Sequence, residues 1–113
     1  MQNAILAAYT NCASTDARQE FERWWEQHVV DVLTIPGFVR ATKYRKSRAQ
    51  GGKNRNSRHE YLVVYEIVSD DVAATMGLLD SAPFPTSPAL AKDAMGMVFI
   101  KQGVVEAGTE TPG

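Results

Sequence analysis

Hydrophobic side chains recur every three or four positions in residues 21–32, which is the spacing of an amphipathic helix with one buried stripe. The residues that share this stripe are Phe21, Trp24, Trp25, His28, Val29 and Val32. The N-cap candidate Asp16 and the helix-breaking Pro36 bound the pattern, so a helix is predicted over residues 16–34. His28 lies near the middle of the stripe, which directs an ionisable imidazole towards the core.

Alternating or continuous apolar positions predict four strands in the rest of the chain. Their predicted ranges are residues 3–11, 38–46, 60–68 and 95–107. A second helix is predicted over residues 70–80, after the cap candidate Ser69, and a short helical turn is predicted over residues 87–93. The order β-α-β-β-α-β is that of the ferredoxin-like fold, an α+β fold in which two helices cover one face of a four-stranded antiparallel sheet.

The first, third and fourth predicted strands are apolar on both faces. In a ferredoxin-like fold the helices cover one face of the sheet, so the other face must be covered in another way. A second copy of the chain, related by a two-fold axis, is the simplest cover. The sequence therefore predicts a homodimer, a dimeric α/β barrel, of one domain that spans residues 1–113.

The composition is that of an ordinary globular domain, since 44% of the 113 residues are hydrophobic and 22% are charged. The net charge of −1 does not favour a nucleic-acid partner. The single Cys12 excludes an internal disulfide framework, which favours a reducing compartment. The sequence has no basic leader-like start and no run of about 20 apolar residues, so a cytoplasmic protein without a membrane partner is expected.

Basic residues are concentrated in one part of the chain. Eight of the twelve lie within residues 40–58, and no acidic residue occurs between Asp31 and Glu60. Residues 47–58 contain no large apolar side chain and are predicted to form a flexible basic loop, which is either a solvated excursion or a loop that steers anions to a cleft. Residues 108–113 are predicted to be a frayed tail.

The first predicted helix and the turn after it carry a motif that resembles the signature of EthD-like proteins, a branch of the dimeric α/β-barrel superfamily. The motif reads Phe21-x-x-Trp24-x-x-x-His28-x-x-x-Val32-Leu33-x-x-Pro36-Gly37-Phe38. The resemblance implies a ferredoxin-like dimer with a reaction pocket between the helices and the sheet of each subunit. It does not fix the reaction, because the superfamily contains quinol monooxygenases, muconolactone isomerases, polyketide cyclases and haem-degrading enzymes.

The resemblance places His28 in this pocket, where its imidazole would act as a general acid or base near pH 7. Interpreted from the residues alone, His28 is instead a core histidine held by one hydrogen bond. Tyr9 and Arg40 join His28 as candidate catalytic residues. Trp24 and Trp25 would form part of the pocket wall and contact the substrate.

The strand residues predicted to line the wall opposite His28 are Tyr9, Arg40, Tyr44, Tyr61 and Tyr65. Arg40 would grip a carboxylate or phenolate of the substrate, or would pair with Asp31 or Glu60. The tyrosines would donate hydrogen bonds to an enolate oxygen, or would simply pack. If the opposite faces of these strands line the pocket, the same tyrosines lie in the dimer interface.

Together with the resemblance, the sequence predicts a cofactor-independent proton-transfer enzyme of the isomerase, cyclase or dehydratase type. Its small-molecule substrate would be a conjugated anion, such as an aromatic-catabolism or polyketide-like intermediate. Two alternatives stay open: a cofactor-free quinol-type monooxygenase, and a non-catalytic dimeric binding module in which His28 is structural. No metal or organic cofactor is predicted, because His28 and His59 lie far apart in the sequence without a cysteine cluster and no glycine-rich phosphate-binding motif is present.

Overall fold

The computed structural model describes residues 1–49 and 59–108, so most of the predicted basic loop and of the predicted tail lies outside the described residues. Within these two ranges the chain forms four strands and two helices, with a 3-10 turn before the first helix. In chain order these elements are β1 (Gln2–Thr10), η1 (Thr15–Ala17), α1 (Arg18–Val32), β2 (Phe38–Arg45), β3 (Tyr61–Ser69), α2 (Val72–Ser81) and β4 (Met95–Ile100).

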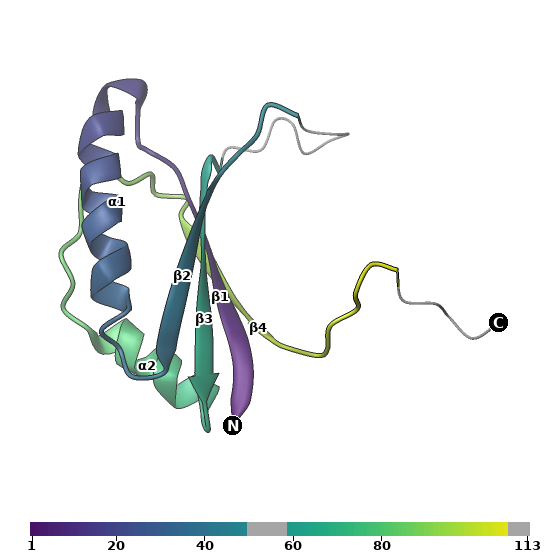
Figure 1. Cartoon of the computed structure of the whole chain (residues 1–113). Coiled ribbons are helices and arrows are strands. Elements are labelled where there is room, and N and C mark those ends of the chain that lie inside the picture. The colour runs from purple at the N-terminus through teal and green to yellow at the C-terminus, as the bar shows by residue number, and fades with distance from the viewer. Residues whose placement is uncertain (50–58, 109–113) are drawn as a thin grey trace.

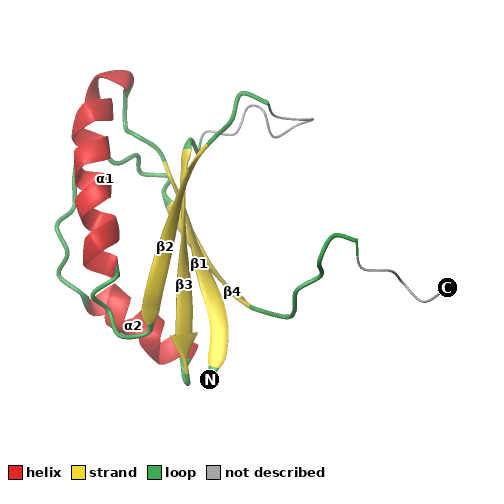
Figure 2. Cartoon of the chain, in the orientation of Figure 1, coloured by secondary structure: helices red, strands yellow, loops and turns green. Residues whose placement is uncertain are grey.

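The strands form one antiparallel sheet in the order β2-β3-β1-β4. Both helices lie on the same side of this sheet, and residues 101–108 lead away from it on the other side (Figures 1 and 2). This arrangement is the ferredoxin-like α+β fold that the order of predicted elements indicates. No layer of the described residues covers the other face of the sheet, which will be called the open face.

The hydrophobic core lies between the helices and the sheet. Alternate residues of β3 are almost fully buried there: Tyr61, Val63, Tyr65 and Ile67. The strand register brings Ala4 and Leu6 of β1 to the same face, where they pack with Val29 and Val32 of α1. The period-2 alternation of β3 and the helical period of α1 therefore meet in a single layer of apolar side chains.

Side-chain caps mark the start of η1, which leads directly into α1, and the start of α2. Ser14 Oγ accepts a hydrogen bond from the Ala17 amide at 3.3 Å, at the start of η1. Asp71 Oδ1 accepts a hydrogen bond from the Ala74 amide at 3.0 Å, and so caps α2. The predicted cap Ser69 lies two residues earlier, where its hydroxyl accepts a hydrogen bond from the Asp71 amide.

Two segments differ from the sequence prediction. Residues 87–93 form no helix, because the backbone there pairs with the segment that follows β1: the Ala91 amide donates to the Asn11 carbonyl at 2.9 Å, and Cys12 bridges to Leu90. The last strand ends at Ile100 rather than at residue 107. Its ladder ends at the pair of Ile100 with Ala4, and one further backbone hydrogen bond joins the Lys101 amide to the Asn3 carbonyl at 2.8 Å.

The turn into β2 depends on Gly37, whose backbone adopts a φ of +101°. A Cβ atom at this position would lie 3.0 Å from Thr75 Cγ2 of α2. We therefore expect Gly37→Ala to lower the free energy of unfolding by about 1–2 kcal/mol, measured by urea denaturation. Gly77→Ala is the matched control, since Gly77 lies in α2 with open space around it; it should instead stabilise by about 0.5–1 kcal/mol. Equal effects of the two substitutions would contradict this explanation.

Candidate functional site

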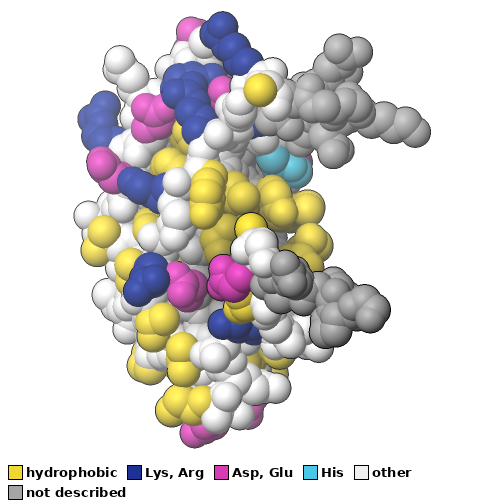
Figure 3. Space-filling view, turned by 45° about the vertical axis from the view of Figure 1, so that its right-hand side comes forward, with side chains coloured by type: hydrophobic (Ala, Val, Ile, Leu, Met, Phe, Trp, Pro, Cys, Tyr) yellow, Lys and Arg dark blue, Asp and Glu magenta, His cyan; other side chains and the backbone are white. Residues whose placement is uncertain are grey.

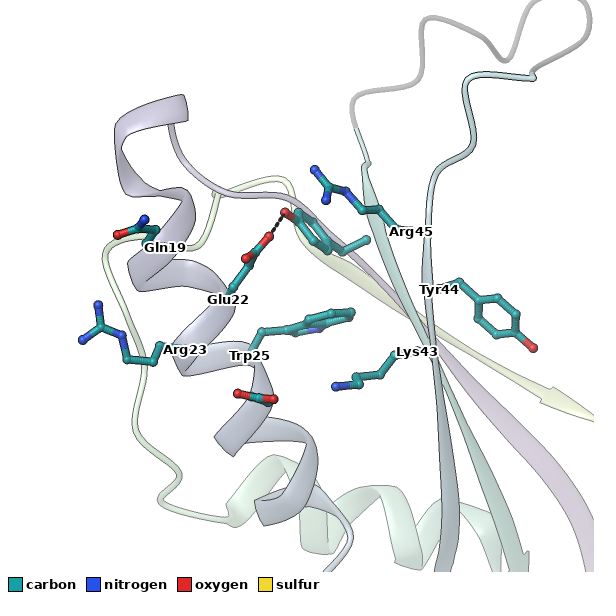
Figure 4. Close-up of a pocket in the computed structure, with 9 residues that line it drawn as sticks. Gln19, Glu22, Arg23, Trp25, Lys43, Tyr44 and Arg45 are labelled. Atoms are coloured by element: carbon teal, nitrogen blue, oxygen red, sulfur yellow. Dashed lines mark hydrogen bonds between the residues drawn. The ribbon is translucent and has the colours of Figure 1, made fainter.

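A cleft of about 570 Å³ opens between α1 and the outer strand β2 (Figure 4). Its volume lies within the range of small-molecule sites in proteins. The residues that line it come from α1, β2 and β3, and are Gln19, Glu22, Arg23, Trp25, Glu26, Lys43, Tyr44, Arg45 and Tyr61. The cleft thus combines aromatic side chains with charged groups of both signs.

Aromatic rings form the inner wall of the cleft. The Trp25 indole meets the Tyr61 ring edge-on, with 5.1 Å between the ring centroids. Behind them lies Phe21, which is fully buried and whose ring centroid is 4.8 Å from that of Tyr61. Lys43 Nζ lies 5.5 Å from the centroid of the Trp25 ring, so an ammonium group sits over the indole face.

The Tyr61 hydroxyl lies at the centre of a polar network in the upper part of the cleft. It accepts a hydrogen bond from Arg18 Nη1 at 2.6 Å and donates one to Glu22 Oε1 at 2.8 Å, the bond drawn as a dashed line in Figure 4. Arg18 also donates to Glu60 at 3.1 Å, and Arg45 pairs with the other oxygen of Glu60 at 3.4 Å. Two guanidinium groups therefore flank the phenol, one on each side of Glu60.

The protonation states in this network follow from burial and hydrogen bonding. Burial, reinforced by the hydrogen bond to Glu22, raises the pKa of Tyr61, so its hydroxyl stays a donor at neutral pH. Burial alone would raise the pKa of Glu60, but Arg18 and Arg45 together bring it below its ordinary value. The hydrogen bond to Glu60 raises the pKa of Arg18. Glu60 is therefore an ionised anchor between two cations.

The structure places the predicted site residues in three different environments. Trp25 and Tyr61 line the cleft. Tyr65 faces the helices but lies deeper in the core, where its ring packs edge-on against Phe38 and burial strongly raises the pKa of its hydroxyl. Tyr65 is not among the cleft residues.

His28 lies against the segment that follows α2. Its ring stacks on Trp24 with 4.6 Å between centroids and meets the edge of Phe84 at 6.2 Å. Trp24 Nε1 in turn donates to the Pro85 carbonyl at 2.9 Å. His28 Nδ1 is buried and has no hydrogen-bond partner within the described ranges 1–49 and 59–108. His28 and Trp24 are not among the residues that line the cleft.

The remaining predicted residues lie on the open face, which corrects the predicted wall. The register pairs Tyr9 and Tyr44 with Leu62, and Arg40 with Glu66, so all three face away from the helices. Arg40 pairs with Glu66 at 3.5 Å and is largely exposed. Tyr44 is one of the residues that line the cleft, but Figure 4 shows its ring pointing away from the cleft, on the far side of β2.

A β-bulge explains the reversal on β2. Phe38 pairs with Ile67 and Arg40 pairs with Glu66, so Val39 is an extra residue with no opposite partner. The bulge turns Lys43 and Arg45 towards the helices, whereas an unbroken alternation would place Arg40 there with Phe38. On β1 no irregularity is involved: both faces are apolar, so their composition does not reveal which face meets the helices.

The sequence interpretation missed the five residues that supply the polar network and the cation over Trp25. They are Arg18, Glu22, Lys43, Arg45 and Glu60. A signal for two of them exists, because positions 18, 22 and 25 follow the i, i+4, i+7 spacing and so share one face of α1 with Trp25.

Protonation of His28 should weaken the fold. Burial lowers the pKa of His28 from its ordinary value of about 6.5, although Asp31 partly opposes the shift. The unfolded chain then binds a proton at a higher pH than the folded chain, so stability is complete above about pH 6.5 and declines as the pH falls towards the lower folded pKa. We expect His28→Gln to remove this decline in the thermal unfolding midpoint. Parallel declines in wild type and variant would contradict the assignment.

The open face is apolar at its centre. Figure 3 shows hydrophobic side chains gathered on the side of the molecule turned away from the helices. Its exposed members include Tyr44, Met95, Met97 and Phe99, which are 42–51% exposed. A hollow of about 360 Å³ lies beside them, lined partly by Ile5, Phe99 and Glu66. Such a patch on a small domain is typical of an interaction surface.

The described residues contain no group of three His, Cys, Asp or Glu side chains placed to hold a metal ion. Among the helices of residues 1–49 and 59–108, none has both the length and the apolar character needed to cross a bilayer.

The sheet order and the two helices on one face of the sheet define a protein with the ferredoxin-like α+β fold. No protein-family model and no curated protein sequence matches the chain. A candidate monooxygenase from Shewanella loihica PV-4 has a similar structure, with a TM-score of 0.57 and 12% identity over 94% of this chain and 99% of its own. A dimeric ferredoxin-like protein of unknown function from Jannaschia sp. CCS1 has a TM-score of 0.55 and 8% identity over 84% of this chain and 97% of its own.

An ethyl tert-butyl ether D (EthD) family protein from Bacillus halodurans C-125 was also found, with a TM-score of 0.49 and 15% identity over 90% of this chain and 100% of its own. At such low identities the first two likenesses show the fold, and the chemistry must be argued from the cleft itself.

Proposed function

We propose that this protein binds a small, planar, conjugated anion in the cleft between α1 and β2, and catalyses a cofactor-independent proton transfer on it, of the isomerase, cyclase or dehydratase type. The observation that carries the proposal is the pairing of the Trp25 and Tyr61 rings with Lys43 and Arg45 in one cleft. Aromatic rings offer a surface on which a flat ligand stacks. The two cations offer charge and hydrogen bonds to a carboxylate or enolate.

The charge pattern favours an anion over a neutral ligand. Arg45 lies with its guanidinium carbon 5.5 Å from the centre of the Tyr61 ring, and Lys43 lies over Trp25. Both cations come from a stretch of chain with no acidic residue. The carboxylate that pairs with Arg45 is Glu60, which Arg18 already partly neutralises.

Binding of phenylpyruvate, measured by isothermal titration calorimetry, tests the proposal. Phenylpyruvate combines an aromatic ring, a carboxylate and an enolisable ketone, and phenylacetone is its uncharged counterpart. We expect phenylpyruvate to bind and phenylacetone to bind about tenfold or more weakly, which is the loss of one charge-assisted hydrogen bond. Lys43→Gln and Arg45→Gln should each remove this preference, whereas Lys92→Gln, an exposed lysine outside the cleft, should not. Equal binding of the two probes would contradict the proposal.

A second candidate function is cofactor-free oxygenation of a quinol-type substrate. The similar fold of the Shewanella protein, described as a candidate monooxygenase, favours it. Oxygen uptake on addition of a naphthalene quinol separates the two candidates, because proton transfer consumes no oxygen. A non-catalytic binding module would bind phenylpyruvate and neither exchange its protons nor consume oxygen.

The open face supports a further part of the proposal, a homodimer formed by two sheets packed face to face. Apolar side chains at its centre, among them Met97 and Phe99, are exposed in the single chain. The Jannaschia protein with a similar fold is described as dimeric. In such a dimer the candidate residues Tyr9, Arg40 and Tyr44 would lie between the subunits, and each cleft would open outwards.

A further inference from the structure

The hydroxyl of Tyr61 has two defined partners inside the cleft. Arg18 Nη1 donates to its oxygen at 2.6 Å, and the hydroxyl donates to Glu22 Oε1 at 2.8 Å. A guanidinium donates and never accepts, so the phenolic hydrogen cannot point at Arg18. The hydrogen is therefore held in the direction of Glu22, on the side where the cleft is lined by both residues.

Of the two carboxylates in the network around Tyr61, Glu22 is the better placed to exchange a proton with a ligand. It projects from α1 into the cleft (Figure 4), and its Oε1 atom is a hydrogen-bond acceptor for Tyr61. Glu60, by contrast, has both oxygens engaged by Arg18 and Arg45. A bound anion that reaches the Tyr61 hydroxyl would also reach Glu22, because the two groups are in direct contact.

We infer that Glu22 and Tyr61 form the proton-transfer pair of this cleft, with Glu22 as the general base and Tyr61 as the hydrogen-bond donor to the developing oxyanion. Arg18 is the positioning residue that directs the Tyr61 hydrogen. The inference rests on the proposed function, since it assigns the groups that carry out the reaction proposed for the cleft.

The step balances without an oxidant or a cofactor. A Glu22 oxygen takes a proton from the carbon next to the substrate carbonyl, so the C–H bond breaks. Its electron pair becomes the C=C bond of the enolate while the carbonyl π pair moves onto oxygen. The Tyr61 hydroxyl turns its hydrogen bond from Glu22 to that oxygen, and protonated Glu22 returns the proton to the same or another carbon of the conjugated system.

The surroundings suit both roles. Burial raises the pKa of Tyr61, so the hydroxyl is neutral and donates rather than titrating near pH 7. Phe21 and Trp25 hold the phenol ring from two sides, which limits its movement during the reaction. Arg45, close to the same ring, adds positive charge near the oxygen that becomes negative.

Exchange of the methylene protons of phenylpyruvate for deuterium, followed by proton NMR in D₂O, tests the inference. We expect the wild-type protein to accelerate the exchange above the buffer rate. Glu22→Gln keeps an amide oxygen that accepts from Tyr61, so the fold should persist while the exchange rate falls by about 10²–10⁴. Tyr61→Phe keeps the ring packing and should cost about 10²–10³. Binding measured by calorimetry should change little in either variant.

Two matched variants separate the pair from other residues. Glu20→Gln makes the same charge change two residues earlier, at an exposed position of α1, and should exchange at the wild-type rate. His28→Gln should also retain wild-type exchange. Arg18→Lys keeps the positive charge but cannot donate to Tyr61 and Glu60 at once as the guanidinium does. It should therefore lower kcat with KM unchanged, and the loss in kcat should be smaller than that of Tyr61→Phe.

The outcomes are distinct. If wild type binds phenylpyruvate but does not exchange it, or if Glu22→Gln exchanges at the wild-type rate, the assignment of Glu22 and Tyr61 is overturned. The same holds if His28→Gln abolishes exchange while Glu22→Gln does not. If wild type does not bind phenylpyruvate at all, the proposed function falls, and the pair falls with it.

Discussion

Replacement of Phe21 by alanine is expected to lower the free energy of unfolding by about 3–5 kcal/mol, a large part of the stability of a domain of this size. Phe21 is fully buried, and its ring contacts Trp24, Trp25 and Tyr61 with centroid distances of 6.1, 6.1 and 4.8 Å. The substitution would leave a cavity behind the wall of the cleft, which neighbouring rings fill poorly because they are held by other partners.

Urea denaturation followed by circular dichroism measures this loss. Val30→Ala, in the same helix but 57% exposed, is the control and should change stability by less than about 0.5 kcal/mol. Phe21→Leu should give an intermediate loss and remain folded, so that phenylpyruvate binding can be measured in it. A loss for Phe21→Ala no larger than that for Val30→Ala would contradict the placement of this ring.

Substitution of Phe99 by aspartate is expected to convert the proposed homodimer to a monomer. Phe99 is 46% exposed in the single chain and pairs with Ile5 on the open face, so the folded subunit does not need it buried. In a face-to-face dimer the new carboxylate would be buried without a partner, and an unpaired buried charge costs several kcal/mol. Light scattering should give about twice the chain mass of 12.4 kDa for wild type and the single mass for the variant.

The control for this experiment is Leu78→Asp, which adds the same charge at an apolar residue of α2, 49% exposed and on the covered side of the sheet. It should remain dimeric. A wild-type protein that is monomeric, or a Phe99→Asp protein that stays dimeric, would contradict the proposed interface.

The order of elements could be predicted from the sequence because each element has a strong period. The alternation of β3 and the stripe of α1 are local signals, and both appear in the structure. The sequence does not fix the N-cap of α2, since Ser69 and Asp71 are both favourable N-cap residues. In the structure Asp71 is the cap. The predicted helical turn over residues 87–93 is wrong because this segment pairs with residues after β1, which are distant in the sequence and leave no local signal.

The site was harder to predict than the fold. The sequence directs Trp25 and Tyr61 to the space between helices and sheet, because both lie on strongly patterned elements, α1 and β3. Arg40 was assigned to the helix-facing wall because nothing in the sequence marks the bulge at Val39, and one extra residue exchanges the faces of a strand. His28 lies on the predicted buried stripe, but the segment that contains Phe84 covers it. Such packing of a loop on a helix leaves no periodic signal.

The central claim is that a planar anion stacks in the cleft beside Trp25. Titration of ¹⁵N-labelled protein with phenylpyruvate tests it directly, because each tryptophan indole gives its own NMR signal. Trp25 lines the cleft, whereas the Trp24 indole N–H is bound to the Pro85 carbonyl outside it. We expect the Trp25 signal to shift in a saturable manner while the Trp24 signal stays in place. A shift of Trp24 without Trp25, or no shift of either, would contradict the claim.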